Sequence, residues 1–389
     1  MVLSKRERVI RTLEHNDEPD VVPIHTLGFE KTNSAYQTFI ATDEYTKNKL
    51  VIKNTYRRGS NNHVGDITEQ RFWQADCWAM DPFAKKLDIK IVKAPPEYTN
   101  SSIEVIGGRI MRLGPQVETG LPYAWYVDGW FKTPEILYSF WDEYGRPSEL
   151  INNKVNYSPQ IWDEYVESLS PYLYPMANLL MPMHENLFEG MTIARVKYYM
   201  RKKPEFIHDV LGEYTKANLE IVKRLSEAGV DVVFYYDDLG MKGRTIFSIK
   251  DLLKFIIPCY KKLYQECKKC GMFIVQHSCG YIDEILPHMV DAGLDCIQAL
   301  EPAAGVNLGH LKETLGDNVS FMGGLDSSRV INFGTPKEIE EHVKSCIMTA
   351  GHEGGYFVGP SHNILNAPWE NCISLRDAMV KHRNYPLKG

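Results

Sequence analysis

From about residue 133 onward the chain alternates short apolar segments with amphipathic ones, and this alternation constrains the fold more than any other feature. The apolar runs are rich in β-branched and aromatic residues, and segments of helical periodicity separate them. They lie at 231–236, 273–277, 296–299, 319–322 and 356–358. Strands that alternate with helices at this spacing form a parallel sheet. Five or six such units favour a closed (β/α)8 barrel, with an open doubly wound sheet as the alternative. Neither a Gly-x-Gly-x-x-Gly fingerprint nor a Walker A pattern is found, so a nucleotide-binding sheet has little support.

The first third of the chain has a different character and predicts an extension packed on the barrel. Residues 4–14 predict a helix, with Ser4 as its N-cap and Glu7 completing a capping box. Residues 89–113 predict a β-meander with the Gly107-Gly108 pair at a hairpin turn. Aromatic residues are dense here, and they indicate either core packing or the wall of a site for a flat, apolar substrate. The fold class is therefore α/β: a (β/α)8 TIM barrel with an N-terminal helical and β-meander extension. We expect one structural domain, with the extension at 1–130 and the main part of the barrel at 131–389.

Polar side chains follow the predicted strands, at the end where a barrel carries its catalytic loops. These residues are Asp237, Asp238, His277, Cys279, Asp326 and His362. Side chains alternate faces along a strand, so the imidazole of His277 and the thiol of Cys279 point the same way. Both are zinc ligands, at about 2.0–2.3 Å from the metal. Gly280 then allows the chain to leave the strand sharply.

We predict a zinc site formed by His277, Cys279 and His362. A catalytic zinc has three protein ligands and one open position, and Asp238 or Glu189 is a candidate for a fourth ligand or a supporting contact. The alternative is a histidine hydrogen-bonded in the core beside an inert buried cysteine. The adjacent acids at 237–238 have an alternative of their own, as caps of the following turn. The Cys-x-x-Cys at 267–270 lies at a helix end and contains two lysines, with no second pair nearby, and does not favour a metal site.

Composition excludes several classes of protein. A net charge of −6 disfavours nucleic-acid binding and gives no reason to expect an anionic membrane partner. No apolar run approaches the about 18 residues of a membrane span, and the first residues have no apolar core of a signal peptide. Eight cysteines in a chain of 389 residues without an export signal indicate reduced thiols. We expect a cytoplasmic protein.

With these motifs placed, the chain resembles the uroporphyrinogen decarboxylase superfamily over nearly its full length, most strongly from about Phe188 onward. The stretches that carry the resemblance are Phe-Glu-Gly-Met at 188–191, Tyr-Asp-Asp-Leu-Gly at 236–240, His-Ser-Cys-Gly at 277–280, Gly-Gly-Leu-Asp at 323–326, and Gly-Gly-Tyr-Phe-Val-Gly-Pro-Ser-His-Asn-Ile at 354–364. The His-x-Cys-Gly motif is similar to that of the zinc-dependent, corrinoid-linked methyltransferases. The decarboxylases themselves use no metal and carry an N-terminal arginine-rich signature. The Tyr-Arg-Arg-Gly at 56–59 is not a convincing substitute for it.

The resemblance implies a reaction. Thiol-methylating members have a further cysteine ligand at the position that His362 occupies here. This difference favours members that demethylate ethers and pass the methyl of an aryl methyl ether (vanillate- or veratrole-like) to the cob(I)alamin of a separate corrinoid protein. That partner is expected to dock transiently over the barrel rim. The expected metal ligands are His277, Cys279 and His362.

The resemblance also implies roles for other residues. Asp238 and Asp237 are expected to be catalytic, with Asp238 as an acid that protonates the departing oxygen when a dry pocket raises its pKa. Alternatively, zinc stabilises that oxygen as a Lewis acid. Glu189, Tyr236 and Asp326 are expected to contact the substrate.

Three other functions stay open. The first is a decarboxylase on the same barrel, in which Asp237 and Asp238 stabilise a protonated pyrrole. The second is a methyltransferase of the same branch with methanol, a methylated thiol, an amine or a haloalkane as methyl donor. The third is a non-catalytic carrier of a corrinoid or tetrapyrrole.

Overall fold

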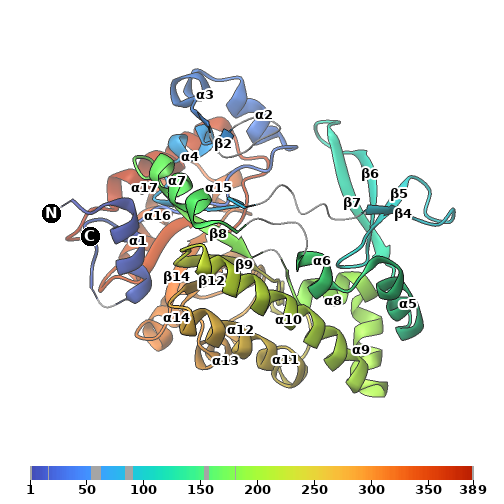
Figure 1. The fold of residues 1–389 in the computed structure, drawn as a ribbon. Coiled ribbons are helices and arrows are strands. Elements are labelled where there is room, and N and C mark those ends of the chain that lie inside the picture. The colour runs from blue at the N-terminus through green and yellow to red at the C-terminus, as the bar shows by residue number, and fades with distance from the viewer. Residues whose placement is uncertain are drawn as a thin grey trace.

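A parallel sheet of seven strands forms the centre of the protein (Figure 1). The computed structural model describes residues 2–15, 17–53, 63–83, 91–152, 157–179 and 181–387, so the Tyr-Arg-Arg-Gly stretch at 56–59 lies outside the described residues. In spatial order the strands are β15 (Tyr356–Pro360), β14 (Ser320–Leu325), β13 (Cys296–Ala299), β12 (Phe273–His277), β9 (Val232–Tyr236), β8 (Tyr174–Leu179) and β3 (Cys77–Met80). The five strands predicted from the apolar runs are all present.

Two residues near the start of the chain close this sheet into a barrel. Ile24 pairs in parallel with Val358 of β15, and His25 pairs in parallel with Cys77 of β3. The backbone N–H of His25 donates to the carbonyl of Val358 at 3.1 Å. Residues 24–25 thus serve as the eighth strand between the two edge strands, and the predicted (β/α)8 barrel class is confirmed. Because β3 and this short strand both come from residues 1–130, that segment supplies barrel strands as well as the expected extension.

Helices cover the outside of the barrel (Figure 1). Those that follow β3 along the chain are α5 (Pro134–Tyr144), α6 (Pro147–Asn152), α7 (Pro159–Leu169), α8 (His184–Met191), α9 (Ile193–Lys202), α10 (Pro204–Glu227), α11 (Ile249–Phe255), α12 (Ile257–Lys269), α13 (Leu286–Ala292), α14 (Leu308–Leu315), α15 (Val330–Phe333), α16 (Pro336–Ala350) and α17 (Trp369–His382). The apolar periodicity predicts one helix over 248–270, but the structure breaks it at Ile256. Pro258, which has no N–H to donate, lies in the first turn of α12. Among the residues that the structure describes, no helix is both long and apolar enough to cross a membrane.

The smaller elements precede the main helices or lie in loops. Two short hairpins are formed by β1 (Val51–Lys53) with β2 (His63–Asp66), and by β10 (Gly240–Met241) with β11 (Arg244–Thr245). The remaining helices are α1 (Lys5–Glu14), α2 (Ser34–Ile40), α3 (Asp43–Asn48), α4 (Thr68–Phe72) and the 3₁₀ turn η1 (Pro302–Ala304).

The first helix, α1, closes the amino-terminal end of the barrel. Its capping box between Ser4 and Glu7 is present as predicted. Val9 and Leu13 pack against the side chains that fill the barrel interior. These interior residues are Cys77, Tyr174, Met176, Val232, Phe234, Val275, Cys296, Met322 and Phe357. Because this end is plugged, a substrate reaches the interior from the opposite end, where the strands have their carboxyl termini.

One buried acid holds the plugged end together. Asp76, just before β3, accepts hydrogen bonds from Lys5 at 2.6 Å, from Arg8 at 2.5 Å and from Arg383 at 2.8 Å. Its second oxygen also accepts the backbone N–H of Ile24 at 2.8 Å. Burial alone would raise the pKa of Asp76, but the three cations lower it overall. The first helix, the closing strand and the last residues of the described chain therefore meet at one carboxylate.

The predicted β-meander is present and projects from the barrel beside α5 and α8 (Figure 1). It consists of β4 (Ile91–Lys93), β5 (Ser101–Glu104), β6 (Arg109–Pro115) and β7 (Pro122–Gly129), with the predicted glycine turn between β5 and β6. Residues 89 and 90 of the predicted first strand lie outside the described residues. The meander approaches α8 closely: a Cβ at Gly190 would lie 2.2 Å from the carbonyl oxygen of Gly107. Glycine at this contact allows Arg109 to reach the acids on α8.

Candidate metal centre and active site

The three predicted zinc ligands converge at the carboxyl-terminal rim of the barrel. His277 is the last residue of β12, Cys279 follows two residues later, and His362 lies two residues after β15. One ligand atom from each residue lies within 4.8 Å of the others. The Nε2 atom of His277 is 3.0 Å from the Sγ atom of Cys279. Gly280 turns the chain away with φ +78°, as the sequence predicts.

A side chain on the neighbouring strand orients His277. The Nδ1 atom of His277 donates a hydrogen bond to Oε1 of Gln298, which pairs with His277 in the register of β12 and β13. A proton fixed on Nδ1 leaves the lone pair of Nε2 free, and Nε2 faces Cys279. Sequence analysis missed Gln298. The available signal was an amide in the otherwise apolar strand 296–299, because a fully buried amide needs a partner.

The loop that carries His362 is held by the turn after β14. The backbone N–H of His362 donates to Oγ of Ser327 at 3.1 Å, and Nδ1 of His362 accepts the backbone N–H of Asn363 at 2.8 Å. Asp326, expected to contact substrate, directs its carboxylate into the same turn. It accepts the N–H groups of Ser328 and Arg329 and pairs with the Arg329 guanidinium. Asp326 thus stabilises the turn that holds the loop of His362.

The two adjacent acids after β9 occupy different environments. Asp238 lies at the cluster: its Oδ1 accepts the backbone N–H of Cys279 at 2.7 Å and is 3.5 Å from Nε2 of His277. Its side chain is 34% exposed, so it faces the open side of the site. Tyr236, just before the pair, lies with its ring 5.5 Å from the ring of His277. Asp238 and Tyr236 therefore flank the predicted ligands.

Asp237 is fully buried and holds the start of α8. Its carboxylate accepts the backbone N–H groups of residues 183–185 at 3.1, 3.0 and 2.8 Å. The hydroxyls of Tyr235 and Tyr260 donate to it at 2.9 and 2.8 Å. Burial raises the pKa of Asp237 to about 6, although these hydrogen bonds favour the charged form. The structure therefore places this carboxylate among helix N–H groups rather than among the predicted zinc ligands.

Two glutamates on the anchored helix α8 lie at the mouth of the site. Arg109 of the meander donates to Glu189 at 2.9 Å and lies 3.4 Å from Glu185, and it also pairs with Glu104 at 2.5 Å. Burial, with the charges of Glu189 and Asp238, raises the pKa of Glu185 to about 8. Burial also raises the pKa of Glu189, against the opposing effect of Arg109. Glu189 was predicted from the sequence, but its i−4 neighbour Glu185 and their shared partner Arg109 were not.

The residues of the cluster fit a zinc ion. Burial and then the charges of Asp238 and Glu301 raise the pKa of the Cys279 thiol well above its usual range. Glu301 lies close because it accepts the backbone N–H of Gly280 at 3.1 Å. A thiol buried among carboxylates is hard to ionise unless a cation compensates the charge, and a divalent ion would do so. Two imidazoles and one thiol are the donors that zinc prefers.

Comparisons with known proteins show which proteins the chain resembles. The uroporphyrinogen decarboxylase (URO-D) family profile matches residues 185–382, slightly more than half of the chain. A methylated-thiol–coenzyme M methyltransferase from Methanosarcina mazei is 22% identical over 179 residues, 46% of this chain and 46% of that protein. A uroporphyrinogen decarboxylase from Geobacter metallireducens is 24% identical over 192 residues, 47% of this chain and 51% of that protein. The chain thus spans about half the length of the curated relatives it matches. A solved structure, a methyltransferase from Methanosarcina mazei, aligns over 97% of this chain and 99% of that chain with a TM-score of 0.59 and 15% identity, which shows a shared fold.

Proposed function

The chain belongs to the uroporphyrinogen decarboxylase family, and we propose that it is a zinc-dependent methyltransferase that moves the methyl group of an aryl methyl ether to the cob(I)alamin of a separate corrinoid protein. The observation that carries the proposal is the convergence of His277, Cys279 and His362 at the open end of the barrel. The similarity of the chain to a methylated-thiol methyltransferase supports methyl transfer as the class of reaction.

The donor set favours an oxygen leaving group. When bound, a zinc ion would act as a Lewis acid toward the ether oxygen. His277 and His362 are neutral ligands and Cys279 contributes one negative charge, so this set leaves the site with net positive charge. A phenolate is a poor leaving group, and a site that keeps positive charge stabilises the charge that develops on its oxygen. A second thiolate in place of His362 would remove that advantage.

Residues around the cluster would handle the proton and the orientation of the substrate. Asp238, partly exposed beside Cys279, is placed to pass a proton to the departing phenolate oxygen once it has itself received one. Glu185 keeps its proton at neutral pH because its pKa is raised to about 8, so it is a second proton source near the same opening. Tyr236 and Glu189 line the approach to the cluster, whereas Asp237 and Asp326 position the elements that carry it.

The corrinoid partner must present its cobalt to the substrate methyl in line with the breaking C–O bond. The amino-terminal end of the barrel is filled by α1. The partner therefore docks over the carboxyl-terminal rim, near the meander and α8. This contact is expected to be transient, since the methylated corrinoid protein must leave after each turnover.

Two other functions have specific support. Uroporphyrinogen decarboxylases are among the matched relatives, which supports decarboxylation on the same barrel. The methylated-thiol methyltransferase supports a thioether donor. Zinc content separates the first alternative from the proposal, and a comparison of methyl donors separates the second.

The test combines metal analysis with methyl transfer. Purified protein should contain about one zinc per chain and convert cob(I)alamin to methylcobalamin with 2-methoxyphenol as the donor. Cys279→Ala should lose both properties. Cys270→Ala, at the partly exposed end of α12, is the matched control and should keep both. Full transfer by metal-free protein would overturn the role of zinc, and transfer from a methylated thiol alone would overturn the aryl ether.

A further inference from the structure

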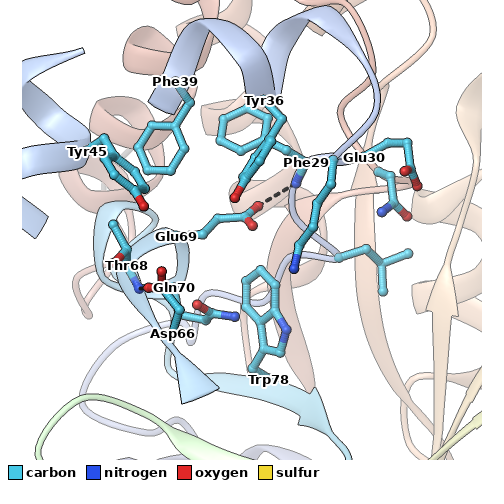
Figure 2. A pocket seen from close by; sticks show the side chains of 13 residues that line it. Phe29, Glu30, Tyr36, Phe39, Tyr45, Asp66, Thr68, Glu69, Gln70 and Trp78 are labelled. Carbon is cyan, nitrogen blue, oxygen red and sulfur yellow. Dashed lines mark hydrogen bonds between the residues drawn. The ribbon is translucent and has the colours of Figure 1, made fainter. Parts of the chain in front are cut away.

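A cavity of about 410 Å³ lies on the rim next to the segment that carries His362 (Figure 2). Asn363, the residue after that predicted ligand, forms part of its wall. The rest of the wall comes from the loop after the closing strand, from the helices α2, α3 and α4, and from the strands β2 and β3. Its volume is in the range of small-molecule sites.

Aromatic side chains form much of the cavity wall. Tyr36, Tyr45 and Trp78 are partly exposed and line it, while Phe29 and Phe39 pack behind them with ring centroids 5.3 Å apart. Figure 2 shows the rings of Tyr36 and Trp78 on opposite sides of one carboxyl group. Flat rings with partly accessible faces suit a flat aromatic ligand.

The carboxyl group between these rings belongs to Glu69, which is 9% exposed. Its Oε1 accepts the backbone N–H of Phe29 at 2.5 Å, the dashed line in Figure 2. The next residue, Gln70, is also buried, and its Oε1 has no hydrogen-bond partner among the described residues. Two hydrogen-bonding groups with little solvent exposure are therefore held at the cavity, where a ligand would complete their bonding.

The backbone is built to admit this carboxyl group. Gly28 has φ +81°, and a Cβ there would lie 2.3 Å from Oε1 of Glu69 and 2.8 Å from the Trp78 ring. The same turn is pinned to the segment after β15, because the carbonyl of Gly28 accepts the N–H of Ile364 at 2.8 Å. The cavity wall and His362 thus belong to one hydrogen-bonded unit, so a ligand in the cavity has a fixed position relative to the predicted metal site.

We infer that this cavity holds the aromatic ring of the methyl donor, and that the donor is a neutral, single-ring aryl methyl ether whose free phenolic hydroxyl hydrogen-bonds to Glu69. This inference rests on the proposed function and narrows its substrate class.

The charges around the cavity select a neutral donor. Glu30, Asp66 and Glu69 line it together with one cation, Lys31. A carboxylate on the ring would face three acids and one lysine, whereas a neutral hydroxyl meets no repulsion. Burial raises the pKa of Glu69 to about 7, so the carboxyl is only partly ionised at neutral pH. A neutral hydroxyl that donates a charge-assisted hydrogen bond to the ionised form is therefore favoured over a cation, which requires full ionisation.

Binding to the metal-free protein tests the inference without methyl transfer. Titration calorimetry with 2-methoxyphenol, supported by tryptophan fluorescence, should show saturable binding. Glu69→Gln keeps the shape and an acceptor for Phe29 but loses the ionisable group, and should weaken binding about tenfold. Gly28→Ala should weaken it at least as much by displacing Glu69. The matched control is Glu213→Gln, a buried glutamate that accepts the N–H of Ser148 at 3.0 Å far from the cavity, and it should bind normally.

Each outcome bears on the inference. Methoxybenzene, which has no hydroxyl, should bind wild type about tenfold more weakly than 2-methoxyphenol does. Equal binding of the two, tighter binding of 4-methoxybenzoate or tetramethylammonium, or unchanged binding in folded Glu69→Gln would overturn it. Glu69-dependent binding without methyl transfer would refute the proposed function and keep the cavity assignment. Methyl transfer that is unchanged in Glu69→Gln would refute the cavity assignment and keep the function.

Discussion

The Nε2 atom of His277 and the Sγ atom of Cys279 face each other across 3.0 Å at the end of β12. Because Nδ1 of His277 donates to Gln298, Nε2 accepts, and the thiol of Cys279 supplies the proton between them. A metal ion that binds this pair must displace that proton. Zinc binding is therefore expected to release protons and to weaken as the pH falls.

The first prediction concerns the support of that pair. Gln298→Leu removes the acceptor that keeps the proton on Nδ1 of His277, and should lower zinc affinity about 10–100-fold. Competition with a chromogenic chelator measures this affinity. Gln276→Leu is not a suitable control, because Gln276 bonds the buried Tyr264. Gln37→Leu, on the surface of α2, is suitable and should bind zinc as wild type does. Equal affinities in all three proteins would contradict the assigned role of Gln298.

A second prediction concerns Asp237, which we expect to contribute mainly to the stability of the fold and not directly to methyl transfer. Asp237→Ala leaves the N–H groups of residues 183–185 and two tyrosine hydroxyls without their acceptor in a dry environment. The free energy of unfolding should fall by about 3 kcal/mol or more. Urea denaturation measures it. Asp377→Ala, at an exposed position on α17, should change it little. A stable Asp237→Ala protein that fails only in methyl transfer would instead make this acid catalytic.

A third prediction uses the pH dependence of stability. Burial raises the pKa of Glu69 from about 4.5 in the unfolded chain to about 7, while Lys31 opposes and Asp66 reinforces the shift. Between these values the folded state binds more protons, so the free energy of unfolding falls as the pH rises from about 4.5 to 7. The contribution is roughly 3 kcal/mol. Glu69→Gln should remove this component. If the free energy of unfolding depends on pH in the same way in wild type and Glu69→Gln between pH 4.5 and about 7, the prediction is contradicted.

A fourth prediction tests the contact between the meander and α8. Gly190→Ala places a methyl group against the carbonyl of Gly107 and should push the meander away, which breaks the Arg109–Glu189 pair. The Michaelis constant for the methyl donor or for the corrinoid protein should rise several-fold, while zinc content stays at wild-type level. Gly212→Ala, on α10 with open space around its Cα, is the control and should have no effect. Loss of zinc from Gly190→Ala would show that the structural change extends from the entrance of the site to the predicted metal ligands.

Local patterns account for what the sequence predicts well. The strands β9, β12, β13, β14 and β15 and most of the long helices follow from periodicity, and His277, Cys279 and His362 were singled out by their positions after strands. The barrel strand β8 (Tyr174–Leu179) was not predicted. The sequence at 20–26 predicts a short strand, but no local pattern assigns it to the barrel, because its pairing partners lie more than 50 residues away at Cys77 and more than 330 away at Val358.

Side-chain pairings across the fold were equally hidden from the sequence. The sequence shows Asp237 and Asp238 as adjacent acids, but only the fold shows that one meets helix N–H groups and the other meets Cys279. Arg109 and Glu69 act through residues that are distant along the chain, and no local pattern marks them, whereas Gln298 is marked only as an amide in an apolar strand.

The closing strand also fixes an order of events during synthesis. Residues 24–25 emerge from the ribosome early, yet one of their two neighbours, β15, emerges more than 300 residues later, and His362 follows it. Until then the nascent barrel has an open seam and the predicted zinc site lacks one ligand. Zinc should therefore bind only after translation has passed β15 and His362. Zinc bound at this site would then indicate that the barrel has closed.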